Sequence, residues 1–352
     1  MKCVCTTLVM DDMARARNVT LADVAARAGV SVITASRAAR RPEMVSAELR
    51  ARVDEAIERL GYVRNQLASA LASTRTGLVG VVVPSLTNGV FADYLASIHD
   101  EMHPLGLQVM VLNARYSAET EERAIATLVG HHVEAMIVTG IDQTERSRLL
   151  LRQSRVPVVQ SMELCDHPLD LNLGLSQYEA GFAATRHLIS LGNKRIGHLS
   201  ARLDPRSRRR HLGYLAALKK AKRADGALVV STPRPSTVSI GAELFRELIE
   251  KAPDIDAIFC CNDDLALGAL FECQRKGIRV PEQVSILGFN DLEFSAQSCP
   301  AISSVATPRS EIGKASARLI IDIIRGSGRR PTERRIDFGY KIIDRESTIK
   351  RR

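Results

Sequence analysis

From residue 78 onward, short apolar runs alternate with stretches that have the amphipathic spacing of helices. The runs include 78–83 (LVGVVV), 107–112 (LQVMVL), 257–260 (AIFC) and 284–289 (VSILGF). Strands that are apolar at nearly every position belong to parallel sheets, because helices cover both faces of such sheets. This pattern covers about 270 residues of the 352, which is more than one sheet and its helices need. The chain is therefore predicted to form two doubly wound lobes.

The composition excludes several other classes of protein. Apolar residues make up 45% of the chain and charged residues 25%, which rules out an intrinsically disordered chain. No uninterrupted apolar run reaches the ~18 residues of a membrane-spanning helix. The seven cysteines have no regular spacing, which indicates a reducing compartment. The segment 1–17 meets Asp11 and Asp12 after a short apolar stretch, so it makes a poor signal peptide, and we expect a cytoplasmic protein.

The net charge of +9 is unevenly distributed along the chain. Residues 1–76 carry 12 basic and 8 acidic side chains, residues 77–324 carry 27 and 28, and residues 325–352 carry 10 and 4. A basic N-terminal part on a nearly neutral body suggests that this part binds a polyanion.

Residues 19–64 show helical patterns and no strand pattern. Thr20 and Asp23 have the spacing of a capping box at the start of a first helix. Gly29 stands where that helix must end in a left-handed turn, and Ser31 is placed to cap a second helix. Two short helices joined by a glycine-containing turn form the helix-turn-helix unit that binds DNA. A third helix is expected between Ser46 and Gly61. The same features also fit a small helical bundle without a ligand.

The second helix would expose Val32, Ile33, Ser36 and Arg37. The guanidinium of Arg37 can reach guanine or a phosphate, whereas Val32 and Ile33 can only read apolar groups such as the thymine methyl. Arg40 is placed for phosphate contact, which positions a protein without specifying sequence. A solvated basic face is the alternative interpretation.

Residues 65–72 could form two helical turns with Leu67 and Leu71 on one side. A segment this short is below the ~12–15 residues that hold a helix in water. It is therefore expected to become helical only when docked. A flexible linker whose leucines rest on the body is the alternative.

Two parallel-sheet lobes bind small molecules between them, next to the carboxyl ends of their strands. The residues that follow predicted strands are therefore candidate contacts, and a cap or turn role is the alternative for each polar one. The candidates are Ser85, Phe91, Thr139, Glu163, Asn262 and Asn290. The run of arginines at 206, 208, 209 and 210 is typical of a solvated face, and only Arg210 is expected to point into the cleft.

Other chemistry finds no support in the sequence. Cys3, Cys5, Cys260 and Cys261 lack the paired spacing of a zinc site. There is no Gly-rich phosphate loop, nucleophile elbow or HExxH motif. We therefore expect no metal, no cofactor and no enzymatic activity. An enzyme on a doubly wound fold is the main rival class. An exported sugar-binding receptor would need a signal peptide in place of the helical head.

The segment LADVAARAGVSVITASRAARRPEMVSAELRARVDEAIERLGYVRNQLASALAS resembles the DNA-binding head of the LacI/GalR family of bacterial transcription regulators. The resemblance continues in VGVVVPSLTNGVFADYL, HLISLGNKRIGHLS, CNDDLALGAL, GIRVPEQVSILGFND and the final DRES. It implies an N-terminal all-α helix-turn-helix head and an α/β body like that of periplasmic binding proteins, with two doubly wound parallel-sheet lobes.

The predicted domains are an N-terminal extension at 1–18, a helix-turn-helix domain at 19–64, a hinge helix or linker at 65–76 and an effector-binding and dimerisation domain at 77–352. Within the last, lobe one takes about 77–175 and 304–335, and lobe two takes about 176–303 and 336–349. Residues 1–17 lie outside the family pattern, so Met1, Met10 and Met13 are all candidate start sites.

The resemblance also implies roles for particular residues. The hinge leucine of this family enters the minor groove of DNA, and Leu71 matches it. The effector contacts of the family correspond to Arg210, Asn262 and Asn290, with Phe91 as a stacking or wall residue. The family usually has Val and Asn where this chain has Ala35 and Arg40, so its base preference is not carried over. The full set of expected DNA contacts is Thr20, Ser31, Val32, Ile33, Thr34, Ser36, Arg37, Arg40, Asn65 and Leu71.

The expected function is that of a homodimeric transcription regulator, more a repressor than an activator, that binds a pseudo-palindromic operator in double-stranded DNA and responds to a small molecule. The segments 200–214, SMELCDHPLDLNLG and FCCNDDLALGALFECQRKGIRVPE resemble the gluconate-repressor subgroup. A sugar acid is therefore the first choice of effector, and a neutral sugar is the second.

Overall fold

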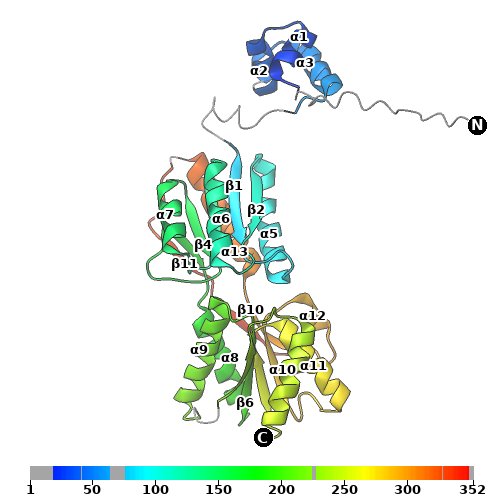
Figure 1. The fold of residues 1–352 in the computed structure, drawn as a ribbon, viewed down its shortest axis with the longest axis vertical. Coiled ribbons are helices and arrows are strands. Elements are labelled where there is room, and N and C mark those ends of the chain that lie inside the picture. The colour runs from blue at the N-terminus through cyan, green and yellow to red at the C-terminus, as the bar shows by residue number, and fades with distance from the viewer. Residues whose placement is uncertain (1–18, 41, 64–75, 224–226, 327, 349–352) are drawn as a thin grey trace, which may run out of the picture. The chain divides into compact units, whose positions relative to one another are not determined.

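The computed structural model describes residues 19–40, 42–63, 76–223, 227–326 and 328–348. The chain divides into two compact units, Met1–Thr76 and Gly77–Arg352 (Figure 1). Each unit has its own buried apolar core. The predicted N-terminal extension and the hinge residues Asn65 and Leu71 lie outside the described residues.

The first unit is a small bundle of helices α1 (Leu21–Ala28), α2 (Val32–Arg40) and α3 (Ala47–Leu60), with a short 3₁₀ helix η1 (Pro42–Met44). Thr20 and Asp23 form the expected capping box, and Gly29 ends α1 with φ +62°. Because these caps satisfy the free backbone groups at the helix ends, they determine where the turn begins. Helices α1, α2 and α3 meet in a core of small side chains: Val24, Ala28, Ala38, Val53 and Ala56.

Lobe one of the body contains a six-stranded parallel sheet in the order β11-β5-β4-β3-β1-β2. Helices α5 (Gly89–Met102) and α13 (Arg309–Arg325) cover one face, and α6 (Ala118–Gly130) and α7 (Glu145–Gln153) cover the other. A 3₁₀ helix, η2 (His103–Leu105), follows α5. The strands are β1 (Leu78–Val83), β2 (Gln108–Asn113), β3 (Ala135–Thr139), β4 (Val158–Ser161), β5 (Leu171–Gly174) and β11 (Arg335–Asp337).

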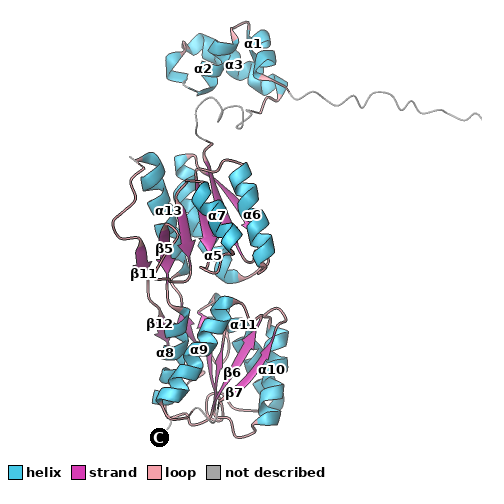
Figure 2. Cartoon of the chain, turned by 60° about the vertical axis from the view of Figure 1, so that its left-hand side comes forward, coloured by secondary structure: helices cyan, strands magenta, loops and turns pink. Residues whose placement is uncertain are grey.

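Lobe two repeats this design with the order β12-β10-β9-β8-β6-β7, in which only β12 is antiparallel to its neighbour. Helices α8 (Gln177–Ser190) and α9 (Pro205–Lys220) cover one face, and α10 (Val238–Lys251) and α11 (Asp263–Lys276) cover the other (Figure 2). A short helix, α12 (Glu293–Gln297), precedes β10. The strands are β6 (Ile196–Ala201), β7 (Leu228–Thr232), β8 (Ala257–Cys260), β9 (Ser285–Asn290), β10 (Ser303–Ala306) and β12 (Lys341–Ile343). The head and the two doubly wound lobes confirm the predicted fold class.

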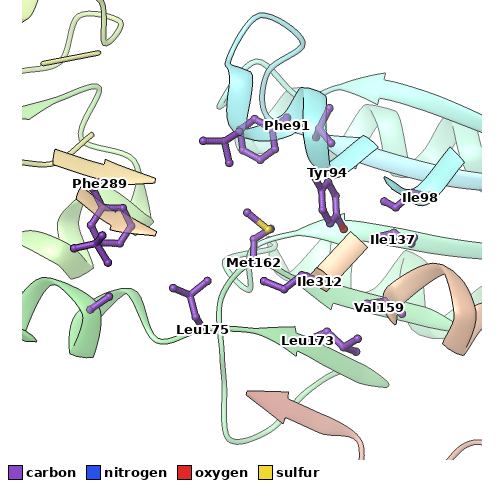
Figure 3. Close-up of a cluster of buried hydrophobic side chains, with 14 of the residues drawn as sticks. Phe91, Tyr94, Ile98, Ile137, Val159, Met162, Leu173, Leu175, Phe289 and Ile312 are labelled. Atoms are coloured by element: carbon purple, nitrogen blue, oxygen red, sulfur yellow. The ribbon is translucent and has the colours of Figure 1, made fainter. Parts of the chain in front are cut away.

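The chain crosses between the lobes three times. It leaves lobe one after β5, returns after β10 and crosses to lobe two again after β11. The predicted lobe boundaries at 304 and 335 fall short of the ends of β10 and β11, at Ala306 and Asp337. The apolar core is continuous across these crossings, with Phe91, Met162 and Leu175 linking the surroundings of Tyr94 in lobe one to Phe289 in lobe two (Figure 3).

Helices α8 and α9 cross in close backbone contact at two glycines. A Cβ atom on Gly213 would lie 2.6 Å from the backbone nitrogen of Phe182, and one on Gly181 would lie 2.8 Å from the Cα of Arg210. Both distances are shorter than any side chain tolerates. The glycine pair therefore lets α9 approach α8 closely, and this contact determines the position of Arg210.

Candidate functional site

A cavity lies between the carboxyl ends of the two sheets. Four of the predicted contacts line it, namely Phe91 from lobe one and Arg210, Asn262 and Asn290 from lobe two. A second cavity lies beside the first and shares Tyr116, Asp204 and Arg206 with it.

Arg210 is held rigidly at the wall of the first cavity. Its Nε donates to Oε1 of Gln177 at 2.9 Å, and its Nη1 donates to the carbonyl oxygen of Cys261. Its guanidinium lies 4.2 Å from the centre of the Phe289 ring. Burial lowers the pKa of Arg210, and nearby Asp204 and Glu163 partly offset this effect. A buried guanidinium with this environment favours an anionic partner.

The two predicted asparagines also have local structural roles. Asn262 caps α11, where its Oδ1 accepts from the backbone nitrogen of Leu265 at 3.2 Å. Its Nδ2 donates to Oγ of Ser236 at 2.6 Å. Asn290 ends β9 with φ +104°, and its carbonyl oxygen accepts from Nη1 of Arg309 at 2.7 Å. Both side chains still line the cavity.

The expectation that only Arg210 of the arginine run points inward is wrong. Arg206 lines both cavities, and its guanidinium lies 5.3 Å from the centre of the Phe91 ring. Arg209 makes a two-pronged contact with Asp142 of lobe one, at 2.8 and 2.6 Å. Only Arg208 is exposed. The reason is that the first turns of α9 face lobe one, which the spacing within one helix does not reveal.

Three predicted contacts lie outside the first cavity. Oγ of Ser85 accepts from the backbone nitrogens of Thr87 and Asn88, both at 3.2 Å, and thereby shapes the turn before α5. Thr139 donates to the carbonyl oxygen of Val82 at 3.0 Å and lines the second cavity.

Glu163 lines neither cavity. Its Oε1 accepts from the backbone nitrogens of Leu164 and Gln177, at 3.1 and 3.3 Å, and its Oε2 lies 3.7 Å from Nε of Arg209. Burial raises the pKa of this carboxyl, and the Leu164 hydrogen bond and the Arg209 charge oppose the shift. Its contacts therefore connect the loop after β4 to the start of α8 and to α9.

Several cavity residues were not predicted from the sequence. Arg202 follows β6 with φ +67°, and its guanidinium lies 3.9 Å from the centre of the Tyr116 ring. Asp204 caps α9 by accepting from the backbone nitrogens of Arg206 and Ser207, at 3.0 and 3.4 Å. Burial opposes ionisation of Asp204, but the charges of Arg206 and Arg210 outweigh it and lower the pKa of this carboxyl. The signal for Arg206 was available, because it lies four residues before Arg210 and hence on the same helix face.

The head carries the predicted DNA-binding side chains on and around α2. Val32 and Ile33 are 48% and 66% exposed, although both are large and apolar. Arg37 is exposed on the same helix, and Ser36 is half-buried. Oγ of Ser31 accepts from the backbone nitrogen of Thr34 at 3.1 Å, and Thr20 is engaged in the cap of α1. Arg40 is the last residue of α2.

A helix-turn-helix unit and a two-lobed ligand cleft in one chain define a ligand-controlled DNA-binding protein. Residues 20–65 match the family model for bacterial regulatory proteins of the lacI family. Residues 76–344 match the model for periplasmic binding proteins and the sugar binding domain of the LacI family. The chain belongs to the LacI family of bacterial transcription regulators.

Its relatives are transcription regulators and not enzymes. The chain is 43% identical over 330 residues to the HTH-type transcriptional regulator GntR of Pseudomonas aeruginosa, covering 94% of this chain and 95% of the relative. The solved structure of transcription regulator GntR from Chromobacterium violaceum is 40% identical, with a TM-score of 0.74, and covers 77% of this chain and 99% of that one. The solved structure of a LacI family transcriptional regulator from Silicibacter pomeroyi is 32% identical, with a TM-score of 0.88. The match covers 95% of this chain and 100% of the chain in that structure.

The chain is thus a DNA-binding transcription regulator with a sugar-binding type of body. Within the described ranges, no three metal-ligating side chains gather in one place. None of the described helices is long and apolar enough to cross a membrane.

Proposed function

We propose that this regulator is a cytoplasmic repressor of genes for sugar-acid use, and that a sugar acid of the gluconate type binds between its lobes. The charge of the first cavity carries this proposal. Its charged lining residues are Arg202, Arg206 and Arg210 against the single carboxylate Asp204. A cavity with this excess of guanidinium groups favours a carboxylate ligand, because the planar fork of arginine matches the two carboxylate oxygens. The similarity to regulators named GntR supports the same class of ligand.

Arg210 is assigned as the central anion contact, with Asn262 and Asn290 as donors or acceptors for hydroxyl groups and Phe91 as the apolar wall. Thr139 would contact a ligand that is long enough to extend into the second cavity. Ser85 and Glu163 are assigned supporting roles, because Oγ of Ser85 and Oε1 of Glu163 accept hydrogen bonds from backbone nitrogens of the loops that shape the cleft.

The DNA-binding half of the proposal rests on the exposed face of α2. Arg37 would contact guanine, and Val32 and Ile33 would contact thymine methyl groups. Thr20, Ser31, Thr34, Ser36 and Arg40 would approach the backbone. Asn65 and Leu71 would enter the minor groove as the hinge of a homodimer on a pseudo-palindromic operator.

Effector and operator would be coupled through the arrangement of the two lobes. A ligand that binds one arrangement better shifts the population toward it, and the hinge transmits that shift to the heads. Arg209 and Asp142 join the lobes across the cleft, and a ligand bound between the lobes would add further contacts to this arrangement.

Isothermal titration calorimetry of the full chain with gluconate tests the proposal. Replacing Arg210 should weaken binding by roughly 2–5 kcal/mol, because the buried carboxylate would lose its cation. Arg210→Lys should restore only part of the affinity, since an ammonium lacks the two-pronged contact. The matched control is Arg208→Ala on the exposed side of α9, which should bind like the wild type.

Arg210→Ala also removes the donor to Oε1 of Gln177 and to the Cys261 carbonyl. Each variant is therefore first checked by thermal unfolding and by operator binding without effector. Tight binding of a neutral sugar, with no competition from gluconate or its keto acids, would refute the anionic effector and favour the neutral-sugar alternative.

A further inference from the structure

Arg206 supplies a second guanidinium to the cleft, beside that of Arg210. This contact was not predicted from the sequence. Arg206 follows Asp204 at the start of α9 and lies one helical turn before Arg210. Its side chain is only 12% exposed, yet it lines both cavities. It therefore stands where the two cavities meet.

The hydrogen-bonding groups of Arg206 are largely unused. Its Nε lies 3.5 Å from Oδ1 of Asp204, and one face of its guanidinium rests over Phe91. Among the described residues, none accepts a hydrogen bond from its two terminal amino groups. Arg210 differs, because it already donates to Gln177 and to the Cys261 carbonyl. No nitrogen of Arg206 is both fully buried and unpaired, so water can reach these donors and a ligand in the cleft would replace that water.

The second cavity has a different charge from the first. Its acidic lining residues are Glu121, Asp142 and Asp204, and its uncharged polar side chains include Tyr116, Ser117, Thr139 and Gln143. Its lining contains no lysine and no arginine other than Arg206. Asp142 is already paired with Arg209. This cavity can therefore hydrogen-bond hydroxyl groups, but a carboxylate placed there would find no cation of its own.

We propose that Arg206 is a specificity-determining residue that, with Arg210, holds the acid group of an effector with a single carboxylate, while the second cavity receives the uncharged hydroxyl-bearing end. This inference rests on the proposed function and deepens it, because it distinguishes monoacids from diacids of the same carbon chain. The physical reason is the charge of the cleft, which has an excess of guanidinium groups in the first cavity and an excess of carboxylates in the second.

The test compares three open six-carbon ligands by calorimetry: gluconate with one acid group, glucarate with one at each end, and glucitol with none. The wild type should bind gluconate at least roughly 10-fold more tightly than glucarate, because the second carboxylate loses its hydration without gaining a cation. Glucitol should bind more weakly than gluconate.

Arg206→Gln should lower gluconate affinity by roughly 10- to 100-fold, the size expected for charge-assisted hydrogen bonds, and should change glucitol affinity little. The gluconate affinity of Arg206→Lys should lie between those of the wild type and Arg206→Gln. Arg208→Gln, two residues further along and exposed, is the matched control and should leave all three affinities unchanged. Thermal unfolding of each variant separates loss of binding from loss of folding.

Three outcomes would overturn the inference. If Arg206→Gln binds gluconate like the wild type, or loses gluconate and glucitol equally, Arg206 does not recognise the acid group, although the proposed function stands. If glucarate binds as tightly as gluconate, the second cavity does not exclude a charge. If the wild type binds neither acid, the proposed function fails and this inference fails with it.

Discussion

Replacing Gly213 by alanine should separate two helices that the effector site depends on. Gly213 lies where α9 crosses α8, three residues after Arg210. A Cβ atom there would lie 2.6 Å from the backbone nitrogen of Phe182 and closer still to the carbonyl oxygen of Tyr178. Both obstacles are backbone atoms, so no side chain can rotate away to make room.

The magnitude follows from two opposing terms. Overpacking of this kind destabilises by up to about 3 kcal/mol, whereas alanine is favoured over glycine within a helix by about 1 kcal/mol. The net loss is about 2 kcal/mol, which for a unit of this size lowers Tm by roughly 4–8 °C. Separation of the helices also stretches the 2.9 Å bond between Arg210 and Gln177, so gluconate affinity should fall as well.

Thermal unfolding of the full chain, followed by calorimetry with gluconate, measures both effects. The matched control is Gly130→Ala at the end of α6, where no atom lies within 4 Å of the added Cβ. That variant should be as stable as the wild type or slightly more stable. If Gly213→Ala melts within about 1 °C of the wild type, the crossing is not close-packed and the reasoning is wrong.

Three further predictions concern other parts of the chain. Arg37→Ala should weaken binding to a selected operator by about 1–3 kcal/mol while changing non-specific DNA binding much less. A gel-shift titration measures this, and an Arg37→Ala protein that binds the operator like the wild type would reject Arg37 as a base contact. Gly29→Ala should destabilise the head by about 1–2 kcal/mol, because φ is +62° and the new Cβ would meet the guanidinium of Arg52, which donates to the Ala28 carbonyl. Circular dichroism of the helices during heating measures this loss, and an unchanged melting curve would contradict the prediction. Burial raises the pKa of Asp263 from 3.8 to about 7, although hydrogen bonds from Ser304 and Leu292 oppose this shift. The Asp263 carboxyl therefore holds its proton more tightly in the folded state than in the unfolded state. The free energy of unfolding should therefore fall as pH rises from about 4 to 7. Urea titrations at a series of pH values measure this dependence, and Asp263→Asn should make it flatter. An unchanged pH dependence in that variant would contradict the prediction.

The helical head could be predicted in detail because its determinants are local. The capping box of Thr20 and Asp23, the left-handed Gly29 and the cap of Ser31 all act within a few residues of the backbone groups they satisfy. The long apolar strands were equally predictable, since a run such as 78–83 can only be covered by helices on both faces.

Short strands with buried polar residues escaped prediction. Strand β5 contains Asn172, whose Nδ2 donates to the carbonyl oxygens of Gln160 and Glu163. Strand β10 begins with Ser303 and Ser304, and the Ser304 hydroxyl donates to Asp263 at 2.6 Å. The partners of these polar groups lie between 9 and 41 residues away in sequence, and only the folded sheet brings them within hydrogen-bonding distance.

The sequence by itself determined the family, the order of the domains and the edge of the sheets at which a ligand can bind. Tertiary structure decided which side chains line the cleft. It engaged Oγ of Ser85 and Oε1 of Glu163 in hydrogen bonds to nearby backbone nitrogens. It also turned Arg206 inward and paired Arg209 with Asp142 of the other lobe. Local sequence can place a residue after a strand or on a helix face. Whether that residue meets the ligand depends on how the α8–α9 pair lies against lobe one, which is set by packing between segments far apart in the chain.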